Sequence, residues 1–307
     1  GGQHPHIRIG PAALDQHPEA ELRERTRIYV HRGLEPALAR QDGLWMLNNK
    51  RWGRIGGING HGYNLTIGKD FLFDEHGYYG LLFDYGSNTV SGAAGSGEYD
   101  SYSLGLYAGN KNKPGSITGF VSYGLQANKG TAYLPVLGQT AESGYDSKTL
   151  GIGVEYAYDL DYGKPEELWH VSPYARLNFT HYRQKAFREH GAGVFDRSFG
   201  SYSDNYAEGE LGLSFDRSEG TGGYGIRLGY KRILTGERQL MEVCFAEDEC
   251  GSLLPVRSWG EGRNHFVAAA YVRHDFSRKW SAGGSLSGDW SNGRREIGAR
   301  LDLAYHF

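Results

Sequence analysis

The sequence predicts an all-β protein: a transmembrane barrel of 12 antiparallel strands in an outer membrane, with an N-terminal α-helix inside its lumen. Three observations lead to this fold class: apolar and polar residues alternate over long segments, short and long connections alternate, and aromatic residues abound without a long apolar run. We expect residues 1–42 to form a linker and pore helix, and residues 43–307 to form the barrel.

The composition favours strands, tight turns and aromatic girdles over helices. The chain of 307 residues has 47 Gly, 22 Tyr, 13 Phe and 6 Trp but 9 Pro and 2 Met. Its mean hydropathy is −0.56, and the absence of an apolar run of about 18 residues excludes a membrane-spanning helix. With 33 basic and 36 acidic residues, the chain lacks the positive excess of a nucleic-acid-binding protein. The first residues lack the features of a signal peptide, so we expect a mature or excised chain.

The clearest strand signal lies at the C-terminus. Between Ile297 and Phe307, apolar residues occupy every odd position except for the small Ala299, and mostly polar or small residues occupy the even ones. This length matches a tilted membrane strand and exceeds the usual strand of a soluble domain. The preceding segment carries Trp280 and Trp290 at its two ends, as expected where a strand crosses two membrane interfaces.

The same alternation defines 12 strands along the chain. Their expected ranges are 43–57, 62–73, 78–90, 99–110, 116–128, 146–159, 168–184, 204–217, 223–234, 263–276, 279–292 and 294–307.

Short and long connections alternate between these strands, as in outer-membrane barrels with periplasmic turns and extracellular loops. Because the strand number is even, both barrel ends are expected at the periplasmic rim. The expected short turns are 74–77, 111–115, 161–165, 218–222 and 277–278, and the expected long loops are 91–98, 129–145, 185–203 and 235–262.

The N-terminal 42 residues differ in composition from the rest. Residues 17–27 are typical of a helix, with Pro18 suited to its first turn. The segment lacks the broad apolar face of a helix in a soluble core. A helix of about 24 residues, rising 1.5 Å per residue, measures about 36 Å, which is comparable to the height of a barrel. Gly33 and Pro36 predict a bend.

Several charged residues are expected to face the lumen, since the alternation directs apolar residues outward. We expect Glu208 and Glu210 to pair with arginines of the linker helix, because unpaired charges are unfavourable in a narrow, partly dry channel. The alternative is a water-solvated pore lining, in which ion pairs stabilise by only about 0–1 kcal/mol. The helix arginines are Arg23, Arg25 and Arg27, and the expected lumen residues are Arg176, Glu208, Glu210, Arg227, Arg300 and Asp302.

The two cysteines, Cys244 and Cys250, enclose the acidic stretch 245–249. So close a spacing in an outer-membrane protein predicts a disulfide hairpin formed in an oxidising compartment. The alternative is a pair of free thiols.

Three segments carry a resemblance to a known family. They are Gly43-Leu44-Trp45 at the start of the first strand, Tyr102–Tyr107 in the fourth strand, and Leu303–Phe307 at the end. Together they make the chain similar to the translocator domain of monomeric autotransporters, the type Va secretion proteins of Gram-negative bacteria.

The resemblance implies transport of a passenger rather than catalysis. A passenger domain would precede Gly1, cross the outer membrane with the help of the barrel, and leave the linker helix plugging the pore. Some passengers of this family resemble subtilisin-like serine proteases. The terminal Tyr305 and Phe307 resemble the signal that the barrel-assembly machinery recognises. We expect a monomer in contact with outer-membrane lipid, with no cofactor and no nucleic-acid partner.

Two other functions remain open at this level. A barrel enzyme, a phospholipase or protease, would use a pair such as His181 with a serine, or Asp196 with Asp204. No motif fixes a nucleophile and its base, and the scattered histidines predict no metal site. A passive diffusion pore is the third possibility, although a helix in the lumen would obstruct it.

Overall fold

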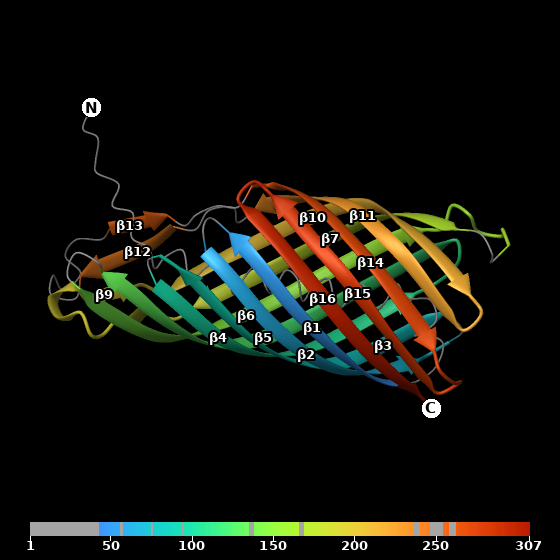
Figure 1. Cartoon of the computed structure of the whole chain (residues 1–307), viewed down its shortest axis with the longest axis horizontal. Helices are drawn as coiled ribbons and strands as arrows, with labels where there is room; N and C mark the ends of the chain where they lie inside the picture. Colours follow the sequence, from blue (N-terminus) through green and yellow to red (C-terminus); the bar gives the residue numbers. More distant parts are fainter. Residues whose placement is uncertain are drawn as a thin grey trace.

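Twelve strands, each antiparallel to its neighbours, close into a barrel in the computed structural model (Figure 1). The described residues are 43–55, 58–74, 76–93, 95–134, 138–165, 169–235, 240–245, 254–257 and 262–307. The predicted linker helix lies outside them, as do Arg23, Arg25 and Arg27.

Each barrel strand overlaps one of the 12 predicted segments, so the predicted closed antiparallel barrel is confirmed. The barrel strands are β1 (Gly43–Ile55), β2 (Ile58–Leu72), β3 (Gly77–Gly92), β4 (Gly95–Asn110), β5 (Gly115–Leu134), β6 (Gln139–Tyr158), β7 (His170–Gln184), β10 (Tyr202–Glu219), β11 (Gly222–Thr235), β14 (Asn264–Asp275), β15 (Trp280–Ser291) and β16 (Arg294–His306).

The barrel closes between its first and last strands. Gly43 of β1 lies opposite His306 of β16, and Ile55 lies opposite Arg294 at the other end of the pair. The beginning of β1 and the end of β16 therefore share one rim, which we call the closing rim. The C-terminus marks this rim in Figure 1. We call the other end the far rim.

Two of the predicted long connections are wrong. Strand β3 continues to Gly92 and β4 begins at Gly95, while β5 continues to Leu134 and β6 begins at Gln139. Serine, glycine and charged residues replace apolar ones in these extensions, so the hydrophobic alternation fades there. The backbone ladder continues nonetheless, because antiparallel pairing requires a hydrogen-bonding partner strand rather than an apolar face.

A second, 4-stranded sheet lies beyond the far rim, where the sequence predicts loops (Figure 1). Its order is β13-β12-β9-β8. The ring of Phe187 stacks on those of Tyr145 and Phe199, with centroids 4.3 and 4.5 Å apart. The barrel strand β6 and the second sheet are thus joined by an aromatic stack. The strands are β8 (Phe187–Arg188), β9 (Arg197–Phe199), β12 (Leu240–Phe245) and β13 (Leu254–Arg257).

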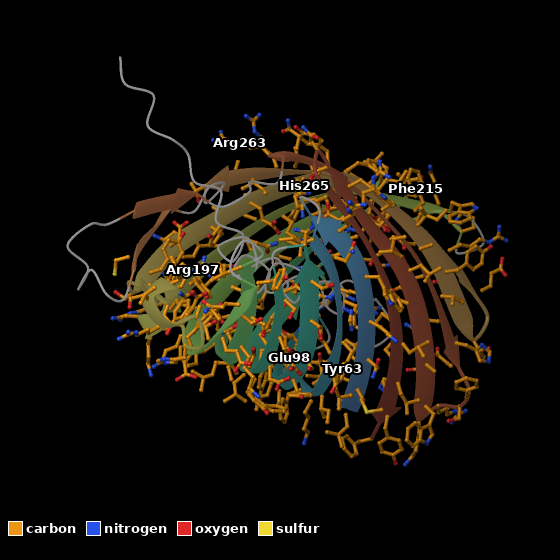
Figure 2. The ribbon with its side chains drawn as sticks, turned by 60° about the vertical axis from the view of Figure 1, so that its left-hand side comes forward. Tyr63, Glu98, Arg197, Phe215, Arg263 and His265 are labelled. Carbon is orange, nitrogen blue, oxygen red and sulfur yellow. The ribbon has the colours of Figure 1, made fainter. Side chains whose placement is uncertain are left out.

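The two faces of the barrel wall differ in polarity. Along β4, inward residues such as Ser101 and Ser103 are buried, whereas outward residues such as Leu104 and Leu106 are exposed. Tyr63, labelled in Figure 2, is another exposed aromatic residue of the outer face. The barrel is therefore apolar outside and largely polar inside, the reverse of a soluble protein. No helix among the described residues is long and apolar enough to cross a membrane.

Candidate functional site

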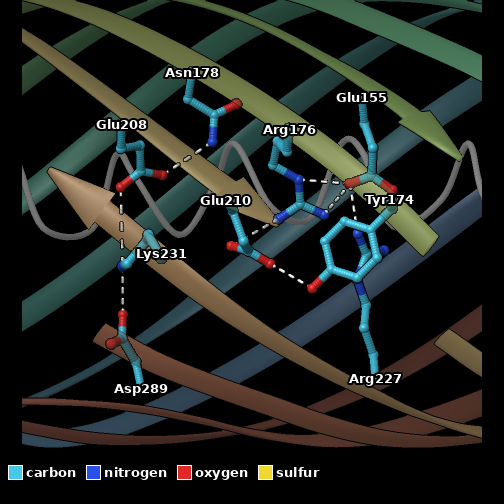
Figure 3. Close-up of polar contacts among 9 residues, drawn as sticks. All are labelled: Glu155, Tyr174, Arg176, Asn178, Glu208, Glu210, Arg227, Lys231 and Asp289. Atoms are coloured by element: carbon cyan, nitrogen blue, oxygen red, sulfur yellow. Dashed lines mark hydrogen bonds and ion pairs between the residues drawn. The ribbon is translucent and has the colours of Figure 1, made fainter. Parts of the chain in front are cut away.

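The inward-facing side chains of the barrel form two contrasting regions. One is a network of charged and polar side chains on β6, β7, β10, β11, β14 and β15, which we call the charged wall (Figure 3). The other is the inward face of β4 and β5, which we call the neutral wall. The charged wall consists of Glu155, Tyr174, Arg176, Asn178, Glu208, Glu210, Arg227, Lys231, His265 and Asp289.

Glu155 is the centre of the charged wall. Its side chain is fully buried, and its Oε2 accepts hydrogen bonds from Nε of Arg176 at 2.6 Å and from Nη2 of Arg227 at 2.7 Å. Arg176 is on the neighbouring strand β7, but Arg227 is on β11, beyond both β7 and β10. One carboxylate therefore ties together two guanidinium groups from strands that are not adjacent. Such charge-assisted bonds are roughly twice as strong as neutral ones.

Tyr174 and Glu210 extend this cluster. The guanidinium carbon of Arg227 lies 3.4 Å from the ring centroid of Tyr174, a cation–π contact. The hydroxyl of Tyr174 donates to Oε1 of Glu210 at 2.8 Å. Oε2 of Glu210 is 3.7 Å from Nη1 of Arg176. Each member of the cluster thus contacts at least two others, which restricts their rotamers.

A second group continues the charged wall around the barrel. Nζ of Lys231 lies 2.5 Å from Oδ2 of Asp289 and 3.8 Å from Oε2 of Glu208. Nδ1 of His265 lies 2.7 Å from Oδ1 of Asp289. The amide of Asn178 donates to Oε1 of Glu208 at 2.9 Å. The group connects β7, β10, β11, β14 and β15 through side chains as well as through the backbone ladder.

The charge of this wall is unbalanced. It contains four carboxylates against three permanent cations, so it carries a net negative charge when His265 is neutral. A cationic segment in the lumen would experience attraction to this side of the barrel.

The neutral wall lies on β4 and β5, which directly follow β6 in the strand order. Serine, threonine, asparagine and glutamine alternate inward with aromatic and glycine residues, and no described inward side chain of β4 or β5 is charged. Nδ2 of Asn128 donates to Oγ of Ser147 at 3.0 Å, and that hydroxyl donates to Oε1 of Gln126 at 2.8 Å. These are neutral, local hydrogen bonds between neighbouring strands.

An aromatic cluster lines the lumen near the closing rim. The indole Nε1 of Trp45 donates to Oδ1 of Asp70 at 3.0 Å and lies 3.0 Å from the hydroxyl of Tyr107, which also bonds to Asp70. The rings of Tyr78 and Tyr107 pack with centroids 6.4 Å apart. Because β1 begins at this rim, the cluster surrounds the point where the barrel chain begins.

The predicted lumen residues occupy the following positions. Glu208, Glu210 and Arg227 are buried members of the charged wall. Arg300 and Asp302 face each other along β16, with Nη2 and Oδ1 3.5 Å apart. The pairing of Glu208 and Glu210 with Arg23, Arg25 and Arg27 stays a prediction, because the arginines lie outside the described residues.

Sequence reasoning missed six of the ten members of the charged wall. Glu155, Lys231, His265 and Asp289 are all inward and buried, yet none was singled out as a lumen residue. The signal that could have found them is the alternation already used for Glu208, applied to every strand instead of a few.

The predicted disulfide involves a cysteine at the far rim. Cys244 lies on β12, is buried and is disulfide-bonded. Cys250 lies outside the described residues, so the pairing of the two stays a prediction. At the closing rim, the ring of Tyr305 packs against Trp280 and Phe307, with centroids 4.9 and 5.5 Å apart.

The residues considered for a barrel enzyme have other partners. Nδ1 of His181 lies 2.8 Å from Oδ1 of Asn205, not from a serine. Asp196 accepts the backbone N–H of Ala192, and Asp204 accepts the hydroxyl of Tyr202. No cluster of metal-binding side chains occurs within the described part of the chain.

Comparison with known proteins identifies the family. Residues 44–287 match the model of the autotransporter beta-domain family. The match covers well over half of the chain, so the protein belongs to the autotransporter beta-domain family, as its terminal and fourth-strand segments indicated. No curated protein matches the sequence.

Several solved structures share the fold. The translocator domain of the autotransporter NalP from Neisseria meningitidis has a TM-score of 0.79 at 17% identity, covering 97% of this chain and 99% of that one. The beta domain of the Bordetella autotransporter BrkA has a TM-score of 0.63 at 14% identity, covering 87% and 100%. The transport unit of AIDA-I from Escherichia coli has a TM-score of 0.58 at 12% identity, covering 97% and 99%. At these identities the likeness concerns the fold.

Proposed function

We propose that this barrel lies in a bacterial outer membrane and mediates passage of an N-terminal passenger domain to the cell surface. The observation that carries the proposal is the reversed polarity of the wall, apolar outside and charged inside, in a member of the autotransporter beta-domain family. The apolar outer face of such a wall can contact lipid, and its polar inner face can contact water or a polar polypeptide segment.

Two rows of outward aromatic residues support the membrane location. Tyr230, Phe266 and Trp290 are direct neighbours across three strands towards the far rim. Trp280 and Tyr305 are paired at the closing rim. The two Trp residues of β15 are separated by about 33 Å along the strand at about 3.3 Å per residue, which at the usual tilt gives a band about 25 Å tall.

We infer that the closing rim is periplasmic and that the far rim is extracellular. The hairpin extensions and the second sheet gather at the far rim, as expected for the larger external loops of outer-membrane barrels. A disulfide at Cys244 is also compatible with a site outside the cytosol.

In our proposal, residues 1–42 remain in the lumen after transport and plug it. The negative excess of the charged wall favours the stretch 23–32, where Arg23, Arg25 and Arg27 outnumber the acidic residues, although residues 1–42 as a whole have no net charge. Glu208 and Glu210 are the proposed contacts, in addition to their partners within the barrel. The passenger would pass through unfolded or as a hairpin, because a barrel of about 12 strands is too narrow for a folded domain.

Other partners follow from the same proposal. Tyr305 and Phe307 would form the contact with the barrel-assembly machinery, and the barrel would act as a monomer. A subtilisin-like serine protease is one candidate for the passenger.

Export provides the decisive test. A signal peptide and an epitope-tagged passenger are fused ahead of Gly1 and expressed in a Gram-negative host, and protease is added to intact cells. We expect the epitope to be digested while the barrel stays folded in the outer membrane. An epitope that stays protected in the periplasm beside an inserted barrel would contradict the transport proposal.

A conductance measurement tests the plug. Planar bilayers containing the full chain should show small, rare openings, and a variant lacking residues 1–42 should conduct several-fold more. The double variant Glu208→Gln/Glu210→Gln should open more often than the full chain, because the arginines lose their carboxylates. Equal conductance with and without residues 1–42 would exclude a helix in the lumen.

A further inference from the structure

Two arginines face each other on the outer surface where the barrel closes. Arg54 of β1 lies directly opposite Arg295 of β16, and both side chains are exposed on the outward face. Directly opposite residues have Cβ atoms about 4.5–5.5 Å apart, and like charges in such a pair repel each other. No carboxylate in the part of the chain that the structure describes pairs with either guanidinium.

The arginine pair lies at the edge of the apolar band. Trp52, two residues before Arg54 on the same face, is 45% exposed, and Trp290 is the cross-strand neighbour of Arg295 on the other side. Tryptophan side chains mark the interface between hydrocarbon and headgroups. Arg54 lies just beyond Trp52 towards the far rim, and Arg295 is level with Trp290. In the proposed membrane, the two guanidinium groups are therefore at the level of lipid headgroups.

Other outward basic residues occur at the same rim. Lys148 of β6 lies opposite Arg183 of β7, a second like-charge pair, and both are exposed. Arg232 is two residues beyond Tyr230 on β11. None of these three has an ion-pair partner among the described residues.

The outward acids at the far rim do not offset this basic surplus. Asp146 is 3.5 Å from Lys185, and Glu98 lies opposite Lys129. At the closing rim, by contrast, Arg217 is 2.7 Å from Glu219. The far rim thus carries two directly opposite pairs of like charge, Arg54 with Arg295 and Lys148 with Arg183.

We propose that the Arg54–Arg295 pair binds a phosphate group of a phosphorylated glycolipid in the outer leaflet. This inference rests on the proposed function, which has the far rim in that leaflet. Two planar guanidinium forks suit the geometry of a phosphate, which accepts bidentate hydrogen bonds from each. An anion between the arginines removes their mutual repulsion, and the neighbouring indoles contact the acyl chains and the sugar.

Native mass spectrometry of the full chain tests this inference. The protein is placed in phosphatidylcholine nanodiscs with a trace of bis-phosphorylated lipid A, and the lipid A molecules retained per barrel are counted. The double variant Arg54→Gln/Arg295→Gln should bind lipid A about tenfold more weakly than the unmodified chain, as expected for lost charge-assisted bonds. The single variant Arg295→Gln should fall in between.

The matched control is Lys69→Gln, an outward basic residue near the closing rim. It should retain lipid A as the unmodified chain does. The inference is overturned if the double variant retains as much lipid A as the unmodified chain. It is also overturned if the unmodified chain retains lipid A without phosphates equally well, or if millimolar inorganic phosphate displaces the lipid.

Insertion is scored separately by the heat-dependent mobility of the barrel on gels. If the barrel inserts but shows no preference for lipid A, only this inference is overturned. Failure of the unmodified chain to insert would overturn the proposed function and this inference together.

Discussion

The charged wall and the neutral wall line the same lumen but are held together differently. In the neutral wall, hydroxyl and amide groups bond to the adjacent strand, as Asn128 does to Ser147. In the charged wall, Glu155 bonds across two intervening strands to Arg227. A neutral group can exchange one partner for a water molecule with little change in free energy, whereas a buried charge without its counter-charge is strongly destabilising. The charged wall is therefore the part of the lumen with a fixed arrangement of side chains.

The largest expected effect is the loss of the central carboxylate. Glu155→Gln leaves Arg176 and Arg227 without their shared counter-charge, and we expect the free energy of unfolding to fall by about 3 kcal/mol. Urea unfolding of the barrel in lipid vesicles, followed by tryptophan fluorescence, measures the change. Ser122→Ala, on the neutral wall, is the control and should change it by less than about 1 kcal/mol. Similar values for both variants would show that the walls do not differ.

A conservative change of Arg227 tests the geometry of the charged wall rather than its charge. Arg227→Lys keeps the positive charge but loses the planar contact with the ring of Tyr174, 3.4 Å away. We expect a loss of about 1–2 kcal/mol in the same unfolding measurement. Unchanged stability would mean that only the charge matters.

Ser147→Ala tests the hydrogen bonds of the neutral wall from the adjacent strand β6. It removes one hydroxyl that links Asn128 and Gln126. The expected decrease is about 1 kcal/mol, the typical contribution of a neutral hydrogen bond. A decrease comparable to that of Glu155→Gln would remove the distinction between the two walls.

The smallest expected effect concerns a carboxylate outside both walls, in the turn before β3. Hydrogen bonds from the backbone N–H groups of His76 and Gly77 hold the pKa of Asp74 below its ordinary value of 3.8. Because the pKa is lowered in the folded turn, the stabilisation is complete above about pH 4 and is lost as the pH falls through the lowered pKa. The chemical shift of the Gly77 amide should titrate there.

The matched control for this titration is Asp74→Asn, which should abolish the acid-induced shift of the Gly77 amide. A shift that persists in this variant would have to come from another group.

The strands were predictable because an apolar outer face and a polar lumen impose opposite polarities on successive residues. The alternation located all 12 barrel strands, but it failed where the strands extend at the far rim, as in 91–98 and 129–145. In those segments small residues mix with polar ones, and the buried residues are small, such as Ala132 and Ala141, so the pattern resembles a loop. The strands β8, β9, β12 and β13 have two to six residues each, too few for an alternating pattern to mark them.

The charged wall was predictable only in part, and for a different reason. Alternation is sufficient to direct Glu208, Glu210 and Arg227 inward. It cannot say that Glu155 would reach Arg227, 72 positions away, because that contact depends on the curvature of the closed barrel and on the length of the arginine side chain. Partner choice in a barrel is a property of the closed sheet, not of any one strand.

The pairing of Gly43 with His306 gives the barrel the topology of a ring. A short peptide joining these ends would leave every backbone ladder intact, and the chain could then be opened at any hairpin. Opening it at the turn after β15 would move both termini to the far rim. A segment fused to the new N-terminus would start on that side and would have no lumen to cross. The hairpin that is opened thus decides at which rim a fused segment begins.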